Sequence, residues 1–476
     1  MLFNSIHFIL FFIIVTLGYF SLGWAGRWRL LLLASCFFYM VFKPAYILIL
    51  FATIVIDYYA GIYIEKSNSQ YKKKILIISL LSNIGILAIF KYYGFINANL
   101  TSVLAHLHIH NSIPSLNELF PSLRLEDVLP IGLSFHTFQA MSYTIEVYRG
   151  KQKAERHFGI YSLYVMFYPQ LVAGPIERPQ NILHQFHEFK AYNFDNIKSG
   201  LVQMAWGLFK KVAIADRLAI WVDYGFQNNA QTGSQTVLMA VFFYAFQIYC
   251  DFSGYSDMAI GAARVMGYDL MENFRTPYLA TSIADFWRRW HISLSTWFRD
   301  YLYISLGGNK VSVFRKNLNL MIVFMVSGLW HGASWNFVIW GFLHGFYLLL
   351  SNLKNNYFKA EEKPSNFVTN IFTGLFTFVV VMFTWVFFRA NGLNNALNIF
   401  KKLINWQYIL PTNSPLNSLE IVFCFVLILT LMLKEKYYFN ISTKSNFKFY
   451  TILISLLTLS YFFGVFENQQ FIYFQF

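Results

Sequence analysis

The amino-acid sequence predicts an all-α integral membrane protein that crosses the bilayer many times. Hydrophobic residues fill 57% of the 476 positions, charged residues fill only 13%, and the mean hydropathy is +0.44. Soluble domains average about 25% charged residues. Apolar runs near the ~20 residues that a membrane-spanning helix needs recur along the whole chain. These observations exclude a disordered chain and argue against a soluble enzyme.

Each apolar run is a candidate helix, and the runs that are short or broken by Gly and Pro are candidate re-entrant segments. The runs lie at about residues 1–22, 28–42, 45–64, 75–96, 128–148, 158–176, 198–222, 236–266, 317–331, 334–352, 367–389, 418–433 and 448–466. The first run has no basic segment before it and no Ala-x-Ala cleavage pattern. We therefore expect a retained span rather than a cleaved signal peptide.

The sequence contains no evident repeat, low-complexity segment or appended soluble domain. We predict one membrane-embedded domain over residues 1–476. Its N-terminal spans lie in 1–148, its motif-rich catalytic core in about 158–352, and its C-terminal spans and aromatic tail in 367–476.

The net charge of +14 reflects 37 basic and 23 acidic residues. A basic balance is one sign of nucleic-acid binding, but the basic residues here stand at the ends of apolar runs, and no nucleic-acid motif appears. Cytoplasmic loops of membrane proteins collect Lys and Arg. Basic loops follow the first, third and fifth runs, whereas the 97–127 gap has three acidic residues and one basic residue, Arg124. We expect an extracytoplasmic N-terminus and no nucleic-acid partner.

The three cysteines have no metal-ligand spacing, so the sequence predicts no metal site and no disulfide framework. They are Cys36, Cys250 and Cys424. The sequence also lacks a Gly-x-Ser-x-Gly nucleophile elbow, a Walker A motif and a His-Glu-x-x-His motif.

Ionisable residues in apolar surroundings are costly and mark function by default, and they are densest in residues 285–300. Helical spacing places three of them, together with Ser295, along one face: Arg288, His291 and Arg299. The segment is too charged to face lipid. Two interpretations remain open, an amphipathic helix at the membrane interface and a helix that lines a polar cavity.

A second polar motif, residues 327–336, contains Trp330, His331 and Asn336 among glycines and tryptophans. Glycine lets a ligand or a neighbouring backbone come close. A lone histidine on an apolar helix is usually a core residue. Here the Gly-rich setting and the polar segment 285–300 upstream favour chemistry.

A third polar motif contains Asp251, Ser253 and Asp257. These residues are candidates for lining a cavity, for pairing with the nearby arginines, or for general acid–base work; a structural ion pair is the commonest outcome. In a fourth motif, residues 167–179, the dense prolines predict a break in the span and a re-entrant or capping loop.

Together these segments resemble the membrane-bound O-acyltransferase family, and most closely its bacterial branch of alginate and peptidoglycan O-acetyltransferase membrane subunits. The resemblance covers nearly the whole chain. The segments that carry it are 134–139 (SFHTFQ), 168–179 (YPQLVAGPIERP), 251–257 (DFSGYSD), 285–295 (DFWRRWHISLS), 298–303 (FRDYLY) and 329–336 (LWHGASWN).

The resemblance implies a ring of membrane helices around a thin central catalytic chamber with re-entrant segments, in a cytoplasmic (inner) membrane. It implies that His331 and His291 are the functional histidines, and that acetyl-CoA is the co-substrate, with no bound cofactor. It also implies an exported esterase-like acetyltransferase partner and a polysaccharide acceptor, either peptidoglycan, alginate or another exopolysaccharide.

In the mechanism we expect, His331 is the general base, and His291 orients the reactants, polarises the thioester carbonyl or stabilises the oxyanion. Three arginines are candidates to hold CoA phosphates or, equally, to snorkel to the membrane interface: Arg288, Arg289 and Arg299. The aromatic tail contains Tyr473. Similar tails in this branch make Tyr473 a candidate acyl relay, with an interfacial aromatic anchor as the equal alternative.

Two other functions compete. The first is a D-alanyl transferase of the same family that uses an acyl carrier protein. The second is a secondary transporter, which predicts inverted repeats that the sequence does not display. A purely structural subunit is the least favoured.

Overall fold

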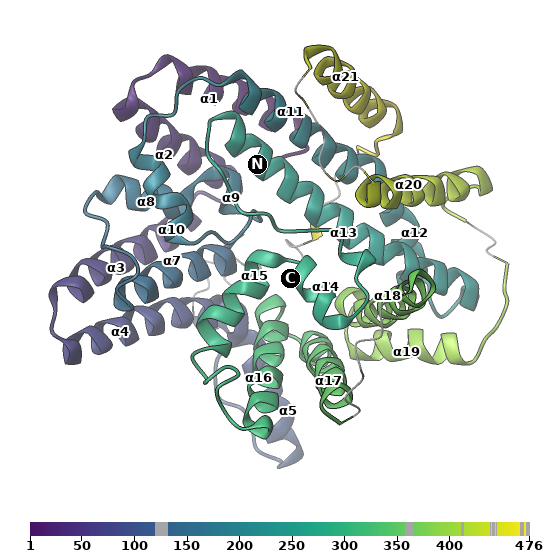
Figure 1. The fold of residues 1–476 in the computed structure, drawn as a ribbon. Coiled ribbons are helices and arrows are strands. Elements are labelled where there is room, and N and C mark those ends of the chain that lie inside the picture. Colours follow the sequence, from purple (N-terminus) through teal and green to yellow (C-terminus); the bar gives the residue numbers. More distant parts are fainter. Residues whose placement is uncertain are drawn as a thin grey trace. The chain divides into compact units, whose positions relative to one another are not determined.

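The computed structural model describes residues 1–119, 132–357, 366–410, 414–437, 439, 443, 445–466 and 471–472. Within these residues every regular element is a helix (Figure 1). This confirms the all-α prediction.

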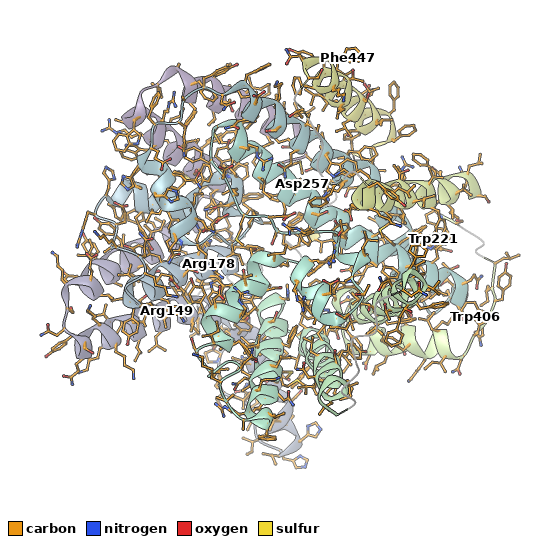
Figure 2. The ribbon with its side chains drawn as sticks, in the orientation of Figure 1. Arg149, Arg178, Trp221, Asp257, Trp406 and Phe447 are labelled. Carbon is orange, nitrogen blue, oxygen red and sulfur yellow. The ribbon has the colours of Figure 1, made fainter. Side chains whose placement is uncertain are left out.

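Six helical segments among the described residues are long and apolar enough to cross a membrane. They are α3 (Tyr46–Lys66), the continuous segment Ser69–His106, α13 (Ser234–Val265), residues Trp335–Leu353 of α17, α18 (Phe367–Arg389) and α21 (Asn446–Phe463). Large apolar side chains point outward from them. Phe447 on α21 is 79% exposed and is labelled in Figure 2. Extensive exposed apolar surface is unfavourable in water and suits contact with lipid, so the chain is a multi-pass membrane protein.

The chain divides into two compact units, and each is described separately. Unit 1 comprises residues 1–197 and 262–271, and unit 2 comprises residues 198–261 and 272–476. The prediction of a single domain remains a prediction.

In unit 1, helices α3, α4 (Ser69–Leu87) and α7 (Leu133–Tyr148) lie side by side (Figure 1). Asp57 of α3 is fully buried and accepts hydrogen bonds from Ser79 Oγ at 2.6 Å and Asn83 Nδ2 at 2.8 Å. A buried carboxylate needs such donors, so these polar residues fix the pairing of α3 with α4.

The other described elements of unit 1 are α1 (Ile6–Ser21), α2 (Trp24–Met40), η1 (Ala88–Tyr92), α5 (Tyr93–His106), α6 (Leu116–Leu119), α8 (Phe158–Met166), α9 (Tyr168–Leu171), α10 (Pro179–Ile182) and η3 (Leu183–His187). The run over 158–176 is broken after Met166, as its prolines predict. The predicted gap after residue 96 is partly helical, because α5 extends to His106.

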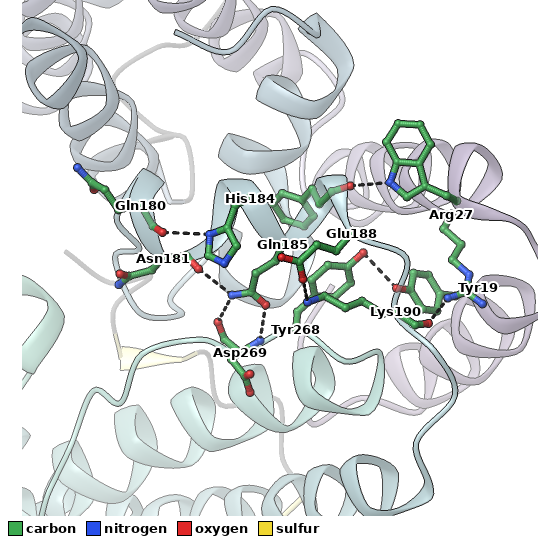
Figure 3. A network of polar contacts seen from close by, with 12 residues as sticks. Tyr19, Arg27, Gln180, Asn181, His184, Gln185, Glu188, Lys190, Tyr268 and Asp269 are labelled. Carbon is green, nitrogen blue, oxygen red and sulfur yellow. Dashed lines mark hydrogen bonds and ion pairs between the residues drawn. The ribbon is translucent and has the colours of Figure 1, made fainter. Parts of the chain in front are cut away.

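The chain that follows this break is held by a polar network (Figure 3). Gln185 exchanges two hydrogen bonds with the main chain of Asp269, at 3.0 and 2.9 Å. The Tyr19 hydroxyl donates to the Tyr268 hydroxyl at 3.1 Å, and Arg27 donates to the Lys190 carbonyl. The bonds from Gln185 and Arg27 satisfy main-chain groups of Asp269 and Lys190, respectively, which lie outside regular structure.

Unit 2 contains most of the polar motifs. Its elements are α11 (Phe194–Phe209, whose first turn belongs to unit 1), η4 (Lys210–Ala215), α12 (Asp216–Gln227), α13 (whose last turn belongs to unit 1), η5 (Pro277–Leu279), α14 (Ile283–Arg289), α15 (Ile292–Trp297), η6 (Phe298–Tyr303), α16 (Val313–His331), α17 (Trp335–Tyr357), α18, α19 (Leu393–Ile404), α20 (Ser418–Tyr437) and α21.

Close helix packing positions two of the helices that carry the polar motifs of unit 2, α16 with His331 and α13 with Asp251. Helices α16 and α17 form a tight pair (Figure 1), and a Cβ atom on Gly328 would lie only 2.2 Å from the Phe337 carbonyl oxygen. Helices α11 and α13 approach in the same way, because a Cβ atom on Gly207 would lie 2.5 Å from the Gly254 carbonyl oxygen. Small residues allow such contacts between membrane helices.

The single helix predicted across residues 285–300 is wrong. Helix α14 ends at Arg289, His291 takes a left-handed backbone conformation with φ of 45°, and α15 then begins at Ile292. Two main-chain bonds from the 273–275 segment cause this break: Ile292 N–H donates to the Asn273 carbonyl, and Arg275 N–H donates to the Arg289 carbonyl, each at 2.9 Å. His291 therefore occupies a turn and does not continue a helical face.

Candidate active site

His291 is fully buried between α14 and α15 and lies against Asn273. Its Nδ1 is 3.1 Å from Asn273 Oδ1. The same oxygen accepts the main-chain N–H of Ser293 at 3.3 Å and its hydroxyl at 2.9 Å. Because a main-chain N–H can only donate, the Asn273 atom facing His291 is the oxygen.

The contact with Asn273 fixes the chemical form of His291. Since Asn273 Oδ1 accepts, His291 Nδ1 carries a proton and donates it, and in the neutral ring Nε2 then holds the lone pair. His291 lies outside the six candidate spans, and burial lowers the pKa of its imidazole to about 3. A neutral imidazole with an accepting Nε2 is suited to take a proton or to accept a hydrogen bond.

His331 ends α16 and is buried among aromatic rings. Its ring centroid is 4.9 Å from that of Trp330, 5.0 Å from Trp340 and 5.2 Å from Phe388, all at steep angles. The Trp330 ring is also 6.3 Å from the His291 ring. The structure thus brings together the two predicted histidines, which are 40 residues apart in the sequence, through one tryptophan.

A third histidine, His344 of α17, is fully buried next to this pair. Its Nδ1 accepts the Trp287 Nε1–H at 3.3 Å, and its Nε2 is 3.0 Å from the Thr384 hydroxyl. Trp340 contacts both His344 and His331, with centroid distances of 4.9 and 5.0 Å. His344 therefore ties α14, α17 and α18 around the site.

A cavity of about 380 Å³ opens beside α14 and α15. Apolar side chains form most of its wall, and three of the predicted polar residues also line it: Arg288, Ser295 and Arg299. Ligand pockets are usually apolar, with a few polar groups that set orientation. The cavity is therefore a candidate binding site. Arg288 and Arg299 bring cationic groups to it, and Arg299 also pairs with Asp300 at 2.7 Å.

Two other predicted residues form structural bonds. Arg289 pairs with Asp285 at 3.0 Å and donates to the Thr276 hydroxyl at 3.1 Å. Asn336 donates to the Ala390 carbonyl at 2.8 Å. These bonds anchor α14 and the end of α18, respectively.

The three polar residues predicted on α13 pair with lysines of the π-helical turn η4 rather than with arginines. Asp257, labelled in Figure 2, contacts Lys210 Nζ at 2.6 Å. Ser253 accepts a hydrogen bond from the same Nζ at 2.8 Å. Asp251 contacts Lys211 Nζ at 2.6 Å.

Sequence reasoning missed several residues of this region, Lys210, Lys211, Asp216 and Asn273, and it assigned no role to His344. The adjacent lysines within the apolar run 198–222 carried a usable signal, since ionisable groups are rare there. Asn273 carried no signal of its own. Tyr473 lies outside the described residues, and no group of three potential metal ligands occurs among those described.

Comparison with known proteins identifies the family. The model of the membrane-bound O-acyltransferase family matches residues 20–390. A probable alginate O-acetylase of Pseudomonas aeruginosa is 36% identical over 88% of this chain and 79% of its own length. The peptidoglycan O-acetyltransferase of Helicobacter pylori is 37% identical over 85% and 80%. The teichoic acid D-alanyltransferase of Bacillus subtilis is 27% identical over 56% and 70%.

The family match spans both histidines, the cavity and the pairs between α13 and η4, and the first two relatives align with most of the chain. The sequence resemblance is thereby confirmed. The chain belongs to the membrane-bound O-acyltransferase family and is an acyltransferase.

Proposed function

We propose that this protein transfers the acetyl group of cytoplasmic acetyl-CoA across the membrane for O-acetylation of an exported polysaccharide. The observation that carries the proposal is the buried pair His291 and His331, which contact one Trp330 ring. Similarity to an alginate O-acetylase and a peptidoglycan O-acetyltransferase supports the acetyl group and the polysaccharide class.

In the proposed reaction, His331 accepts the proton of an attacking hydroxyl, and the hydroxyl oxygen bonds to the thioester carbonyl carbon. The carbon–sulfur bond breaks, and the CoA thiolate leaves with the proton that His331 returns. General-base assistance of this kind contributes about 10²–10⁴-fold. The attacking hydroxyl belongs to Tyr473 or to the exported partner.

His291 orients the attacking hydroxyl in this scheme. Its Nε2 holds a lone pair when Nδ1 donates to Asn273, and the lowered pKa of the ring keeps it neutral. A neutral ring in this tautomer accepts a hydrogen bond at Nε2 but has no proton there to offer a carbonyl or an oxyanion. Among the roles considered for His291, the tautomer supports orientation.

Acetyl-CoA would bind at the cavity beside α14 and α15. Arg288 and Arg299 line it and would contact the phosphates, for which the guanidinium geometry is suited. We further propose a cytoplasmic membrane location, an extracytoplasmic N-terminus and an exported esterase-like partner. Lys73 is exposed, so Lys73→Cys tests the orientation: labelling by an impermeant thiol reagent from outside the cell would contradict it.

The deciding experiment identifies both the acyl donor and the acylated product. Purified protein in proteoliposomes is supplied with labelled acetyl-CoA or with a D-alanyl carrier protein, and polysaccharide fractions of cells with and without the protein are compared by mass spectrometry. We expect acetyl transfer and loss of polysaccharide O-acetyl groups without the protein. His331→Ala should lack transfer, whereas His184→Ala, an exposed histidine, is the matched control.

A D-alanyl transferase is the second candidate, supported by similarity to the teichoic acid D-alanyltransferase. Transfer from the carrier protein but not from acetyl-CoA would favour it. Substrate uptake without any covalent transfer would favour a transporter.

A further inference from the structure

The end of α21 and the chain that follows it are hydrogen-bonded to α12 and η4. Arg217 of α12 donates to the Phe463 carbonyl at 2.9 Å. Two residues later, the Val465 N–H donates to the Val212 carbonyl, also at 2.9 Å. The chain therefore turns back from the end of α21 toward the helices that carry the buried ion pairs.

The next described residues, Phe471 and Ile472, are buried, with exposed fractions of 1% and 5%. The main-chain N–H of Ile472 donates to Asp251 Oδ2 at 2.8 Å. This is a bond from the C-terminal segment to the middle of α13, across 221 positions of sequence.

The other oxygen of Asp251 is held by a buried ion pair, which leaves Oδ2 free to face the Ile472 N–H. Asp251 Oδ1 lies 2.6 Å from Lys211 Nζ, which also contacts Asp216 at 2.8 Å. One lysine therefore contacts two buried carboxyl groups, and the second oxygen of Asp251 is left to accept a further hydrogen bond. A hydrogen-bond donor entering the protein interior is stabilised beside such an acceptor.

The Phe471 side chain fills an aromatic site on the same helix. Its ring stacks on Tyr255 with a centroid distance of 4.6 Å and an angle of 29°, and lies 6.0 Å from the Phe252 ring. The Phe252 ring in turn meets His291 edge to face at 4.7 Å. One aromatic ring therefore separates the bound segment from a candidate catalytic histidine.

We propose that Asp251, Phe252 and Tyr255 of α13 form a docking site for the C-terminal segment, in which Asp251 binds the Ile472 main chain and the two rings bind Phe471. The residue that follows Ile472 in the sequence is Tyr473, the candidate acyl relay. Resting on the proposed function, this makes Asp251 a positioning residue, which holds the two residues directly before Tyr473 one aromatic ring away from His291.

Thiol accessibility at residue 472 tests the docking without any enzymatic activity. The substitution Ile472→Cys keeps the main-chain N–H, and Cys36→Ser removes the half-buried native thiol; Cys250 and Cys424 are buried. In the full chain in detergent, maleimide labelling should be slow. Asp251→Ala should accelerate it at least tenfold. Asp216→Ala, which alters the same ion cluster but not the bond to Ile472, should leave it slow.

A second variant, Phe471→Ala, tests the docking site independently in case Asp251→Ala misfolds. Phe471→Ala leaves the ion cluster intact, removes the ring that stacks on Tyr255, and should also accelerate labelling of the thiol introduced at position 472 at least tenfold. Rapid labelling without either substitution, or continued protection with Phe471→Ala, would overturn the docking site.

The effect on transfer is measured separately by comparing Ile472→Pro with Ile472→Ala. Proline removes the N–H that Asp251 accepts, whereas alanine retains it. We expect acetyl transfer by Ile472→Pro to be at least tenfold below that of Ile472→Ala. Equal rates would overturn the positioning role. If the unmodified chain transfers no acetyl group, the proposed function fails, whereas the labelling result still decides the docking site.

Discussion

The two histidines of the site are held by different kinds of neighbours. His291 lies in a polar cradle in which Asn273 fixes the ring nitrogen that carries the proton. His331 lies in an aromatic cage of Trp330, Trp340 and Phe388, whose ring contacts restrict where the imidazole can be. The polar cradle therefore fixes the tautomer of His291, whereas the aromatic cage fixes the position of the His331 ring.

The comparison predicts that removing the caged histidine has the largest effect on chemistry. His331→Ala should reduce acetyl transfer by about 10²–10⁴-fold, because it removes the proposed general base, while the protein still inserts and purifies as a single species. Initial rates in proteoliposomes, with melting temperatures as the folding check, measure this. A rate within tenfold of the unsubstituted protein would remove His331 from the chemistry.

The polar cradle can be broken without touching either histidine. Asn273→Leu removes the oxygen that accepts from His291 Nδ1, so the ring can adopt the other tautomer. Loss of the partner that orients a metal-bound histidine typically costs about 10–100-fold, and by analogy we expect a fall in transfer of the same size. An unchanged rate would show that the tautomer of His291 is irrelevant.

Asn273→Asp should restore the acceptor but add a negative charge. A carboxylate stabilises the imidazolium, so it raises the pKa of His291 from its low value. We expect transfer to recover at alkaline pH and to fall on acidification with a midpoint nearer neutrality, because protonated His291 cannot accept a hydrogen bond. The pH–rate profile checks this, and a profile identical to that of the unsubstituted protein would contradict it.

Two arginines near His291 should differ in the property that their substitution changes, the KM for acetyl-CoA for one and the melting temperature for the other. Arg299→Gln alters a side chain that lines the cavity, and we expect the KM for acetyl-CoA to rise about five- to tenfold, since a lost hydrogen bond to a charged group is worth about 1.5–3 kcal/mol before solvent screening. Arg289→Gln breaks the pair with Asp285 and should lower the melting temperature with a change in KM below twofold. Equal effects on KM would contradict this division.

Much of the fold is predictable because a helix that crosses the bilayer needs an apolar run of sufficient length. The run at 236–266 corresponds to α13 (Ser234–Val265), and the run at 367–389 corresponds to α18 (Phe367–Arg389). A long apolar run is sufficient to predict such elements, since a helix bonds every main-chain group within itself.

The site is less predictable because its decisive partners are distant in the sequence. The helix break at His291 depends on Asn273, which lies 18 positions earlier in the chain. The sequence around neither residue predicts that the two are in contact. A structural ion pair was the commonest outcome expected for the carboxylates of α13, with the nearby arginines as candidate partners. The partners are instead Lys210 and Lys211, which the π-helical turn of η4 directs inward. Chemistry-bearing residues were recognisable by type, whereas their pairing required the tertiary structure.

The smallest predicted effect concerns stability, and it tests the neutral state of His291 directly. The pKa of His291 is about 3 in the folded protein, against about 6.5 when unfolded. Between these values the unfolded state binds one more proton, so the stability that this residue contributes is lost as the pH falls below 6.5. At pH 5 the loss amounts to about 2 kcal/mol.

His291→Gln cannot take up this proton, so its melting temperature should fall less between pH 7.5 and pH 5 than that of the unsubstituted protein. Asn273→Asp should reduce the fall as well, because its carboxylate lets the folded protein keep the proton. Thermal unfolding in detergent at the two pH values measures both. If all three proteins lose the same amount on acidification, His291 is not held neutral, and the polar cradle then fixes only its position, as the aromatic cage does for His331.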